Sequence, residues 1–191
     1  MIITIGRQYG AGGREVGEKL AKKLQIPLYD RKLIAIIATH LEKGVSLEEM
    51  NLSYDNLYGS TSPYETMLGD MQKIDDDNYL FRAQAKTIRL LAQRGPGIFV
   101  GRCANYILKD DKKACHFFIA ADDAYRTARG AAVYHKSLKE LKKEDEKRAS
   151  FYNYYTGAKW GDPADYDITI NTGRTGIEKA VDIISDYAKE K

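Results

Sequence analysis

Residues 3–24 read ITIGRQYGAGGREVGEKLAKKL and contain the features that decide the fold. The segment begins with β-branched apolar residues, which are typical of a buried parallel strand. A glycine-rich turn follows at 10–13, and Val16, Leu20 and Leu24 then recur every four residues, as on one face of a helix. In α/β sheets the first strand–turn–helix connection commonly binds phosphate, because glycines expose backbone N–H groups beside the positive end of the helix dipole. The segment therefore predicts a phosphate-binding loop.

The loop lacks the lysine that phosphate-binding loops of the pattern G-x-x-x-x-G-K-[ST] carry. When Gly12 is set at the second glycine, Arg7 occupies the first glycine position and Gly13 the lysine position. Arg14 or Arg7 is expected to supply the missing charge, since a guanidinium binds phosphate oxygens in bidentate geometry. The alternative is a glycine-rich turn that no longer binds phosphate. The predicted nucleotide contacts are Arg7, Gly10, Ala11, Gly12, Gly13, Arg14 and Glu15.

A dinucleotide-binding fold is a second interpretation of the same glycines. Residues 10–12, with Asp30 at the end of the next predicted strand, partly match G-x-G-x-x-G and its later acidic residue. The third glycine position holds Glu15, however, and the glycines begin four residues after the strand. These two departures favour the phosphate-binding loop.

Strands alternate with helices along the rest of the chain. The predicted strands lie at 1–5, 26–30, 96–101, 114–121 and 166–172. This alternation indicates an α/β domain with a mainly parallel five-stranded sheet covered on both faces, the three-layer sandwich of P-loop NTPases. Within this single domain, the segment 44–78 is expected to be an insertion, and the highly charged segment 122–160 a helical lid.

The composition is that of an ordinary globular domain. The chain has 191 residues, of which 43% are hydrophobic and 30% charged. No apolar run approaches the roughly 20 residues needed to cross a bilayer, and the N-terminus lacks the basic and apolar regions of a signal peptide. These features predict a cytoplasmic protein without a membrane partner. A formal net charge of +3 is too small to indicate nucleic-acid binding, and the composition is compatible with a homo-oligomer.

Four segments together resemble one known family. They are residues 3–24, IPLYDRKLI at 26–34, FRAQAKTIRLLAQRGPGIFVGRCANYIL at 81–108 and FYNYYTGAKWGDPADYDITINT at 151–172. Over nearly the full chain this pattern is similar to the cytidylate-kinase-like family, whose members are P-loop relatives of cytidylate kinase. The resemblance implies transfer of the γ-phosphoryl group of ATP, with Mg²⁺, to a small acceptor, above all a nucleoside monophosphate such as CMP. The alternative from another class is a non-catalytic nucleotide- or anion-binding protein.

The resemblance also assigns roles on the two substrate sides. The loop at 7–15 would hold the donor β- and γ-phosphates, and the insertion would lie on the acceptor side. Asp30 and Arg31 match positions near the acceptor nucleotide. Arg102 follows the third predicted strand within a glycine–arginine–aspartate motif, whose aspartate is replaced here by Cys103. Arg102 is therefore expected to bind the acceptor phosphate.

Four arginines are the candidate catalytic residues. Phosphoryl transfer needs positioning and cancellation of negative charge more than a nucleophilic side chain. By the resemblance, Arg126 and Arg129 lie at the start of the lid and Arg148 at its far end, and Arg14 joins them around the transferring group. Residues three apart share one face of a helix, as Arg126 and Arg129 would. The remaining charges of the lid, at 136–147, are expected to form a solvated face.

Glu15 is the candidate magnesium ligand. Mg²⁺ takes oxygen ligands, and Glu15 lies where a threonine hydroxyl commonly helps to hold it. The carboxylate would equally favour the dipole of the helix that it begins, so both interpretations stay open.

Aromatic residues near the lid and in the insertion have two interpretations each. Those at 151–160 either stack a base or pack under the lid. Tyr54, Tyr58 and Tyr64 either line the acceptor pocket or form a dimer contact.

Overall fold

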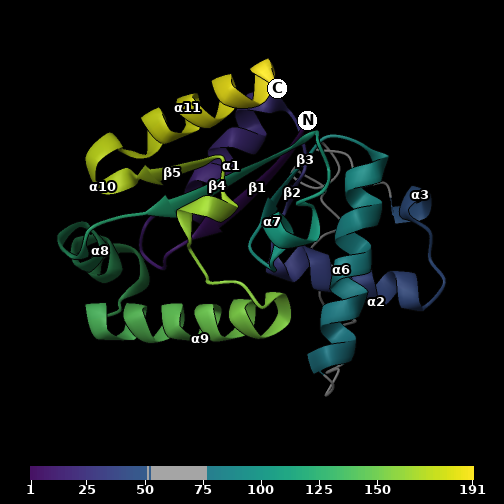
Figure 1. The fold of residues 1–191 in the computed structure, drawn as a ribbon, viewed down its shortest axis with the longest axis horizontal. Coiled ribbons are helices and arrows are strands. Elements are labelled where there is room, and N and C mark those ends of the chain that lie inside the picture. Colours follow the sequence, from purple (N-terminus) through teal and green to yellow (C-terminus); the bar gives the residue numbers. More distant parts are fainter. Residues whose placement is uncertain (51, 53–76) are drawn as a thin grey trace.

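A computed structural model describes residues 1–50, 52 and 77–191. Within these ranges the chain forms a five-stranded sheet of order β2-β3-β1-β4-β5 (Figure 1). The strands are β1 Ile2–Arg7, β2 Leu28–Tyr29, β3 Gly97–Val100, β4 Ala114–Ala120 and β5 Ile168–Asn171. Every neighbouring pair is parallel, which confirms the predicted parallel α/β sheet.

Helices cover both faces of the sheet, as the predicted three-layer sandwich requires. On one face α1 Gly13–Leu24 and α11 Ile177–Glu190 share a core with β1 and β4, around the fully buried Phe117. On the other face α2 Arg31–Glu42 and α6 Asp77–Arg94 pack around Phe99, together with the short helices α3 Leu47–Met50 and α7 Ala104–Ile107. Burial on two faces explains why the strands read as continuous apolar runs.

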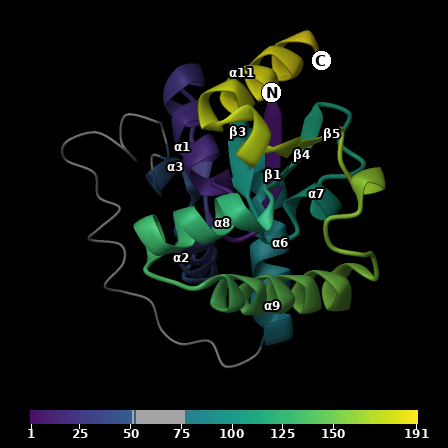
Figure 2. The same cartoon turned by 90° about the vertical axis from the view of Figure 1, so that its left-hand side faces the viewer.

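The charged segment at 122–160 folds as helices at the edge to which the strands point. It contains α8 Asp123–Arg129, the π-helical turn η2 Gly130–Tyr134 and α9 Leu138–Thr156. Figures 1 and 2 both show α8 beside α9, outside the sheet and its covering helices. A capping box starts α9, in which the Ser137 hydroxyl accepts from the Glu140 amide and the Glu140 carboxylate accepts from Ser137 N at 2.8 Å. That this segment moves as a lid stays a prediction.

The last elements return the chain to the sheet. A 3₁₀ turn, η3 Pro163–Asp165, precedes β5, and α10 Thr172–Thr175 joins β5 to α11. Most of the predicted insertion at 44–78 lies outside the described residues, as do Tyr54, Tyr58 and Tyr64. Among the residues that the structure describes, no helix has the length and hydropathy needed to cross a membrane.

Candidate active site

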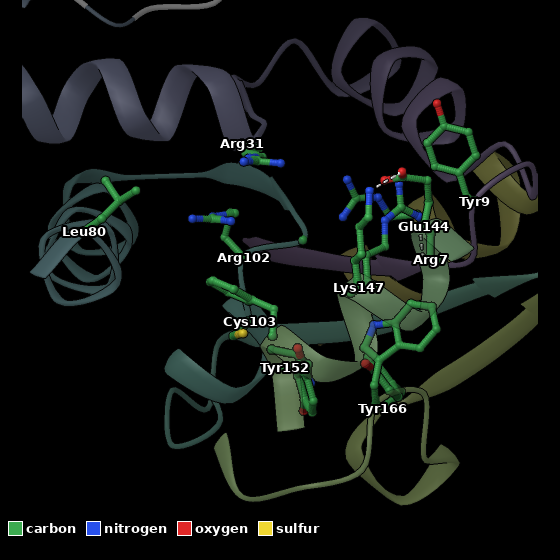
Figure 3. Close-up of a pocket in the computed structure, with 16 residues that line it drawn as sticks. Arg7, Tyr9, Arg31, Leu80, Arg102, Cys103, Glu144, Lys147, Tyr152 and Tyr166 are labelled. Atoms are coloured by element: carbon green, nitrogen blue, oxygen red, sulfur yellow. Dashed lines mark hydrogen bonds and ion pairs between the residues drawn. The ribbon is translucent and has the colours of Figure 1, made fainter. Parts of the chain in front are cut away.

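A cationic cavity of about 400 Å³ lies at the carboxyl ends of β1 and β3, beside α9 (Figure 3). Among the residues that the structure describes, its charged lining consists of Arg7, Arg31, Arg102, Lys147, Arg148 and Glu144. Aromatic rings form much of the neutral wall, together with Leu80, Cys103 and Asn105. Because Glu144 already pairs with Lys147 at 2.8 Å, the described part of the lining carries an excess of positive charge. Such a cavity attracts an anion.

Arg7 lies against Gly13, the residue at the lysine position of the loop pattern. It is the last residue of β1, and its side chain crosses Gly13 to reach Gly101. A Cβ on Gly13 would stand 2.5 Å from Arg7 Cβ, and a Cβ on Gly101 would stand 2.0 Å from Arg7 Nη1. No side chain fits at position 13 while Arg7 adopts this path. The pattern G-x-x-x-x-G-K-[ST] would place a glycine at position 7 and a lysine at position 13. This chain has the cation at position 7 and the glycine at position 13, so the two residue types are exchanged.

The surroundings of Arg7 disfavour the charged form of its guanidinium. Burial, followed by the positive charge of Arg148, lowers the pKa of the Arg7 guanidinium to about 9, and the Asp30 carboxylate acts in the opposite direction. In the described part of the chain no carboxylate lies within ion-pair distance of Arg7. A bound anion would stabilise the charged form.

Arg14, the other candidate for the missing charge, points elsewhere. Its side chain is 65% exposed, and its Nε lies 2.9 Å from Glu18 Oε1. Its Nη2 lies 3.4 Å from Asp30 Oδ2. Asp30 meanwhile caps α2, because its Oδ1 accepts from Leu33 N at 2.9 Å. Of the two arginines that the sequence leaves open, Arg7 is the one that lines the cavity.

The glycine loop itself is covered in this structure. Gly10, Gly12 and Gly13 are buried, and Ala11 has no exposed surface. A Cβ on Gly10 would lie 2.9 Å from Leu141 Cδ1 of α9, so this helix lies directly over the turn. These four predicted contact residues do not line the cavity. Gly12, with φ 79°, precedes α1 and has no side chain, so no capping oxygen at this position accepts from the first N–H groups of the helix.

The acceptor-side candidates come together at the end of β3. Arg31, the first residue of α2, and Arg102 both line the cavity, where Figure 3 shows them on the side nearest Leu80. Cys103 lies beside Arg102, and burial raises the pKa of its thiol to about 12. The thiol therefore stays neutral at physiological pH, unlike the aspartate that it replaces.

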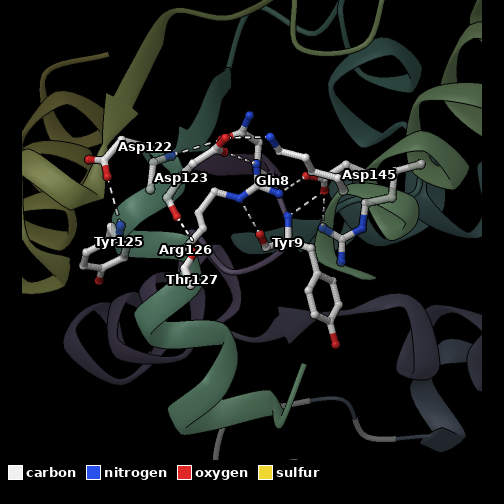
Figure 4. Close-up of polar contacts among 11 residues, drawn as sticks. Gln8, Tyr9, Asp122, Asp123, Tyr125, Arg126, Thr127 and Asp145 are labelled. Carbon is white, nitrogen blue, oxygen red and sulfur yellow. Dashed lines mark hydrogen bonds and ion pairs between the residues drawn. The ribbon is translucent and has the colours of Figure 1, made fainter. Parts of the chain in front are cut away.

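Arg148 and Arg126 have different surroundings. Arg148 lines the cavity, donates from Nη1 to Arg7 O at 3.2 Å and stacks 4.8 Å from the Tyr9 ring centroid. Arg126 is 3% exposed and lies outside the cavity lining. Its Nε donates to Tyr9 O at 2.9 Å, and its Nη2 pairs with Asp145 (Figure 4). Asp145 Oδ1 accepts from Tyr9 N at 2.6 Å, so this cluster joins α8, α9 and the loop.

The last two predicted residues, Arg129 and Glu15, form an ion pair. Arg126 and Arg129, three residues apart on α8, thus contact Tyr9 and Glu15 respectively. The described residues contain no group of three or more metal-binding side chains. Mg²⁺ needs only one or two protein carboxylates when phosphates and waters supply its other ligands. Glu15 offers one such carboxylate, which in this structure pairs with Arg129, so its role as a magnesium ligand stays a prediction.

Sequence reasoning missed Tyr9, Asp145 and Gln84, whose Oε1 accepts from Arg102 Nε at 2.7 Å. Tyr9 lies at an unspecified position of the loop pattern, and Gln84 is one polar residue within an amphipathic helix. Asp145 lies in the run 136–147, whose charges the sequence assigns to a solvated face. Its position three residues before Arg148, on the same helix face, was the available signal.

Comparison with known proteins identifies the family. The model of the cytidylate kinase-like family matches residues 2–174. The chain belongs to this family. A curated cytidylate kinase from Methanothrix thermoacetophila, similar to this chain, is 28% identical over 179 residues, which cover 91% of this chain and 90% of that protein.

Solved structures show the same fold. An uncharacterized protein from Eubacterium ventriosum is 28% identical and superposes with a TM-score of 0.76, over 100% of this chain and 99% of that one. Shikimate kinase from Bacteroides thetaiotaomicron is 16% identical and superposes with a TM-score of 0.56, over 99% of this chain and 98% of that one. A gluconokinase from Sinorhizobium meliloti is 13% identical, with a TM-score of 0.53 over 98% of this chain and 93% of that one. The fold of the family is thus that of P-loop kinases, and the dinucleotide-binding interpretation is wrong.

Proposed function

We propose that this member of the cytidylate kinase-like family transfers the γ-phosphoryl group of ATP to a nucleoside monophosphate such as CMP. The observation that carries the proposal is the convergence of Arg7, Arg102 and Arg148 on one cavity beside the glycine loop. Phosphoryl transfer depends on such convergence, because the reacting groups carry several negative charges that must be cancelled and held in line. The similarity to a curated cytidylate kinase supports the choice of acceptor.

Each arginine has a distinct role in this proposal. Arg7 replaces the lysine of the loop, and Arg102 with Arg31 binds the acceptor phosphate. Arg148 lies beside Arg7, since its Nη1 donates to Arg7 O, and would close over the transferring group. Arg126 acts as a positioning residue through its contacts to Tyr9 and Asp145.

The donor site requires movement of the segment over the loop. Leu141 covers Gly10, and Arg129 pairs with Glu15 at the start of α1. When α8 and α9 draw back, the amides at the start of α1 would receive the donor phosphates. Glu15 would then hold Mg²⁺, which supplies charge neutralisation when bound, and Arg129 would turn to the phosphates.

A coupled assay with ATP, Mg²⁺ and a panel of nucleoside monophosphates tests the proposal directly. Phosphorylation of at least one acceptor is the expected result. The covered glycines favour one alternative, a non-catalytic nucleotide- or anion-binding protein. If no acceptor is phosphorylated while ATP still raises the melting temperature, this alternative is correct.

Arg102→Ala is expected to raise the KM for the acceptor about 10- to 100-fold, because a charge-assisted contact to its phosphate is lost. The KM for ATP should change by less than about twofold, since Arg102 serves the acceptor side. Initial rates at varied CMP and varied ATP measure both values. Arg89→Ala, an exposed arginine on α6, is the control. Equal loss for both substrates would contradict the assigned role.

A further inference from the structure

The glycine loop is held by a buried hydroxyl from a distant part of the chain. Thr172, the first residue of α10, follows directly after β5 and has no exposed surface. Its Oγ1 donates to Ala11 O at 2.6 Å and lies 3.2 Å from Ala120 O at the end of β4. A threonine hydroxyl has one hydrogen to donate, so the shorter contact is the main hydrogen bond. Thr172 therefore joins the middle of the loop to the ends of β4 and β5.

The connection from β5 to α11 also packs directly against the loop. A Cβ on Gly12 would stand 2.4 Å from Cδ1 of Ile177, the first residue of α11. Gly10 and Gly12, on either side of Ala11, have φ values of 84° and 79°, which glycine adopts without a steric cost. The same conformational freedom lets the peptide groups between the two glycines turn easily. The loop therefore needs a contact from outside to hold one orientation.

The hydrogen bond to Ala11 O sets the direction of a backbone amide. Ala11 O and Gly12 N belong to one trans peptide group, whose C=O and N–H bonds point in opposite directions. The bond to Thr172 thus turns the Gly12 N–H away from α10. A phosphate-binding loop works through N–H groups that point at one anion. A reversed peptide would present a carbonyl oxygen to that anion and repel it.

This contact does not depend on the helices that cover the loop. Leu141 of α9 covers Gly10, whereas Thr172 reaches the loop from the connection between β5 and α11. Withdrawal of α8 and α9 would leave the hydrogen bond of Thr172 in place. The loop would then keep its orientation while the donor phosphates enter.

We propose that Thr172 is a positioning residue for the donor site: its hydroxyl holds the Ala11–Gly12 peptide so that the Gly12 N–H binds polyphosphate. This inference rests on the proposed function for the identity of the donor, ATP. It adds that phosphate binding by the loop requires a side chain 161 positions further along the chain than Ala11.

The test replaces the hydroxyl by a methyl group in Thr172→Val. A methyl group cannot approach Ala11 O as closely as the 2.6 Å of the hydroxyl, so the peptide must turn or shift. The KM for ATP should rise about 5- to 50-fold, while the KM for CMP stays within about twofold of the wild type. Thr172→Ser keeps the hydroxyl, and both of its KM values should stay within about threefold.

Thr87→Val is the matched control. Thr87 lies in α6, on the other face of the sheet, is 1% exposed and donates to a backbone carbonyl, Ala83 O, at 2.9 Å. The same substitution there removes a buried hydrogen bond of the same kind, and both KM values should stay within about twofold of the wild type. If Thr172→Val loses stability but keeps the wild-type KM for ATP, the role of Thr172 is only structural and the inference is overturned.

A second measurement needs no turnover. ATP with Mg²⁺ should raise the melting temperature of the wild type, and Thr172→Val should need at least about fivefold more ATP for the same rise. If no acceptor is phosphorylated while this difference is seen, the proposed function is wrong and the role of Thr172 stands. If ATP stabilises both proteins equally, or does not stabilise the wild type, the inference is overturned. An equal loss of the response to CMP would also overturn it.

A second pair of variants covers the case in which Thr172→Val does not fold. Thr172→Ala and Thr172→Ser both lack the methyl group, so they differ only in the hydroxyl. The alanine variant should need about 5- to 50-fold more ATP than the serine variant for the same rise in melting temperature. Equal ATP requirements in this pair would overturn the inference.

Discussion

Arg7→Ala is expected to lower kcat by about 10³-fold while the protein remains folded. Arg7 lines the cavity, and its side chain occupies the space above Gly13 where a loop lysine would begin. Removing one preorganised charge beside a transferring phosphoryl group typically costs two to three orders of magnitude in rate, and no lysine is present in the loop to compensate. A steady-state assay coupled to ADP formation measures the loss, and circular dichroism checks the fold.

Because Arg7 and Gly13 stand in the glycine and lysine positions of the loop pattern, a second set of variants tests the role of Arg7 further. Gly13→Lys alone should be inactive and destabilised by about 1–3 kcal/mol, because its Cβ would stand 2.5 Å from Arg7 Cβ. The double variant Arg7→Gly/Gly13→Lys restores the pattern G-x-x-x-x-G-K and should return kcat to within about tenfold of the wild type. If the double variant is no more active than either single variant, Arg7 does not stand in for the lysine.

Arg14→Ala separates the two arginines that the sequence leaves open. Arg14 is exposed and paired with Glu18 and Asp30, outside the cavity lining. Its loss should reduce kcat at most about tenfold, because exposed ion pairs contribute little. A loss as large as that of Arg7→Ala would transfer the lysine's role to Arg14.

The fold and the positions of the main cations could be predicted from local patterns. The β-branched run before Gly6, the four-residue period after Gly13 and the later strand–helix alternation each agree with the structure. Arg102 was also predictable as a cavity residue, because a polar residue directly after a buried strand lies at the carboxyl edge of a parallel sheet.

The arrangement within the site depends on contacts between distant segments. Arg7 is preferred to Arg14 as the replacement for the lysine only because the absent side chains of Gly13 and Gly101 leave room for the side chain of Arg7. Pairing of Gln84 with Arg102 joins residues 18 apart, and Tyr9 meets Asp145 across 136 residues. Local periodicity carries no information on such pairs, so a single sequence does not predict them.

Arg126→Met is expected to destabilise the protein by about 3–5 kcal/mol, the second large effect. The substitution removes the main counter-charge of Asp145, whose side chain is 12% exposed, and the donor to Tyr9 O. Burial already raises the pKa of Asp145 above its usual value, although Tyr9 N and Arg126 oppose that rise. Of the described residues, only the more distant Arg148, whose Nη1 lies 3.6 Å from Asp145 Oδ1, would then oppose the charge of this carboxylate, which is strongly unfavourable at such a buried position. Urea unfolding followed by circular dichroism measures the loss.

Neutralising both partners distinguishes a buried ion pair from a purely catalytic arginine. In Arg126→Met/Asp145→Asn the asparagine oxygen still accepts from Tyr9 N, no carboxylate is left buried there, and the charge that loses its partner is that of the more exposed Arg148. This double variant should recover at least about half of the stability lost in Arg126→Met. Arg174→Met, at an exposed position, should stay within about 0.5 kcal/mol of the wild type. If Arg126→Met is as stable as that control, the cluster does not hold α8 and α9 against the loop, and Arg126 returns to the candidates for direct contact with phosphate.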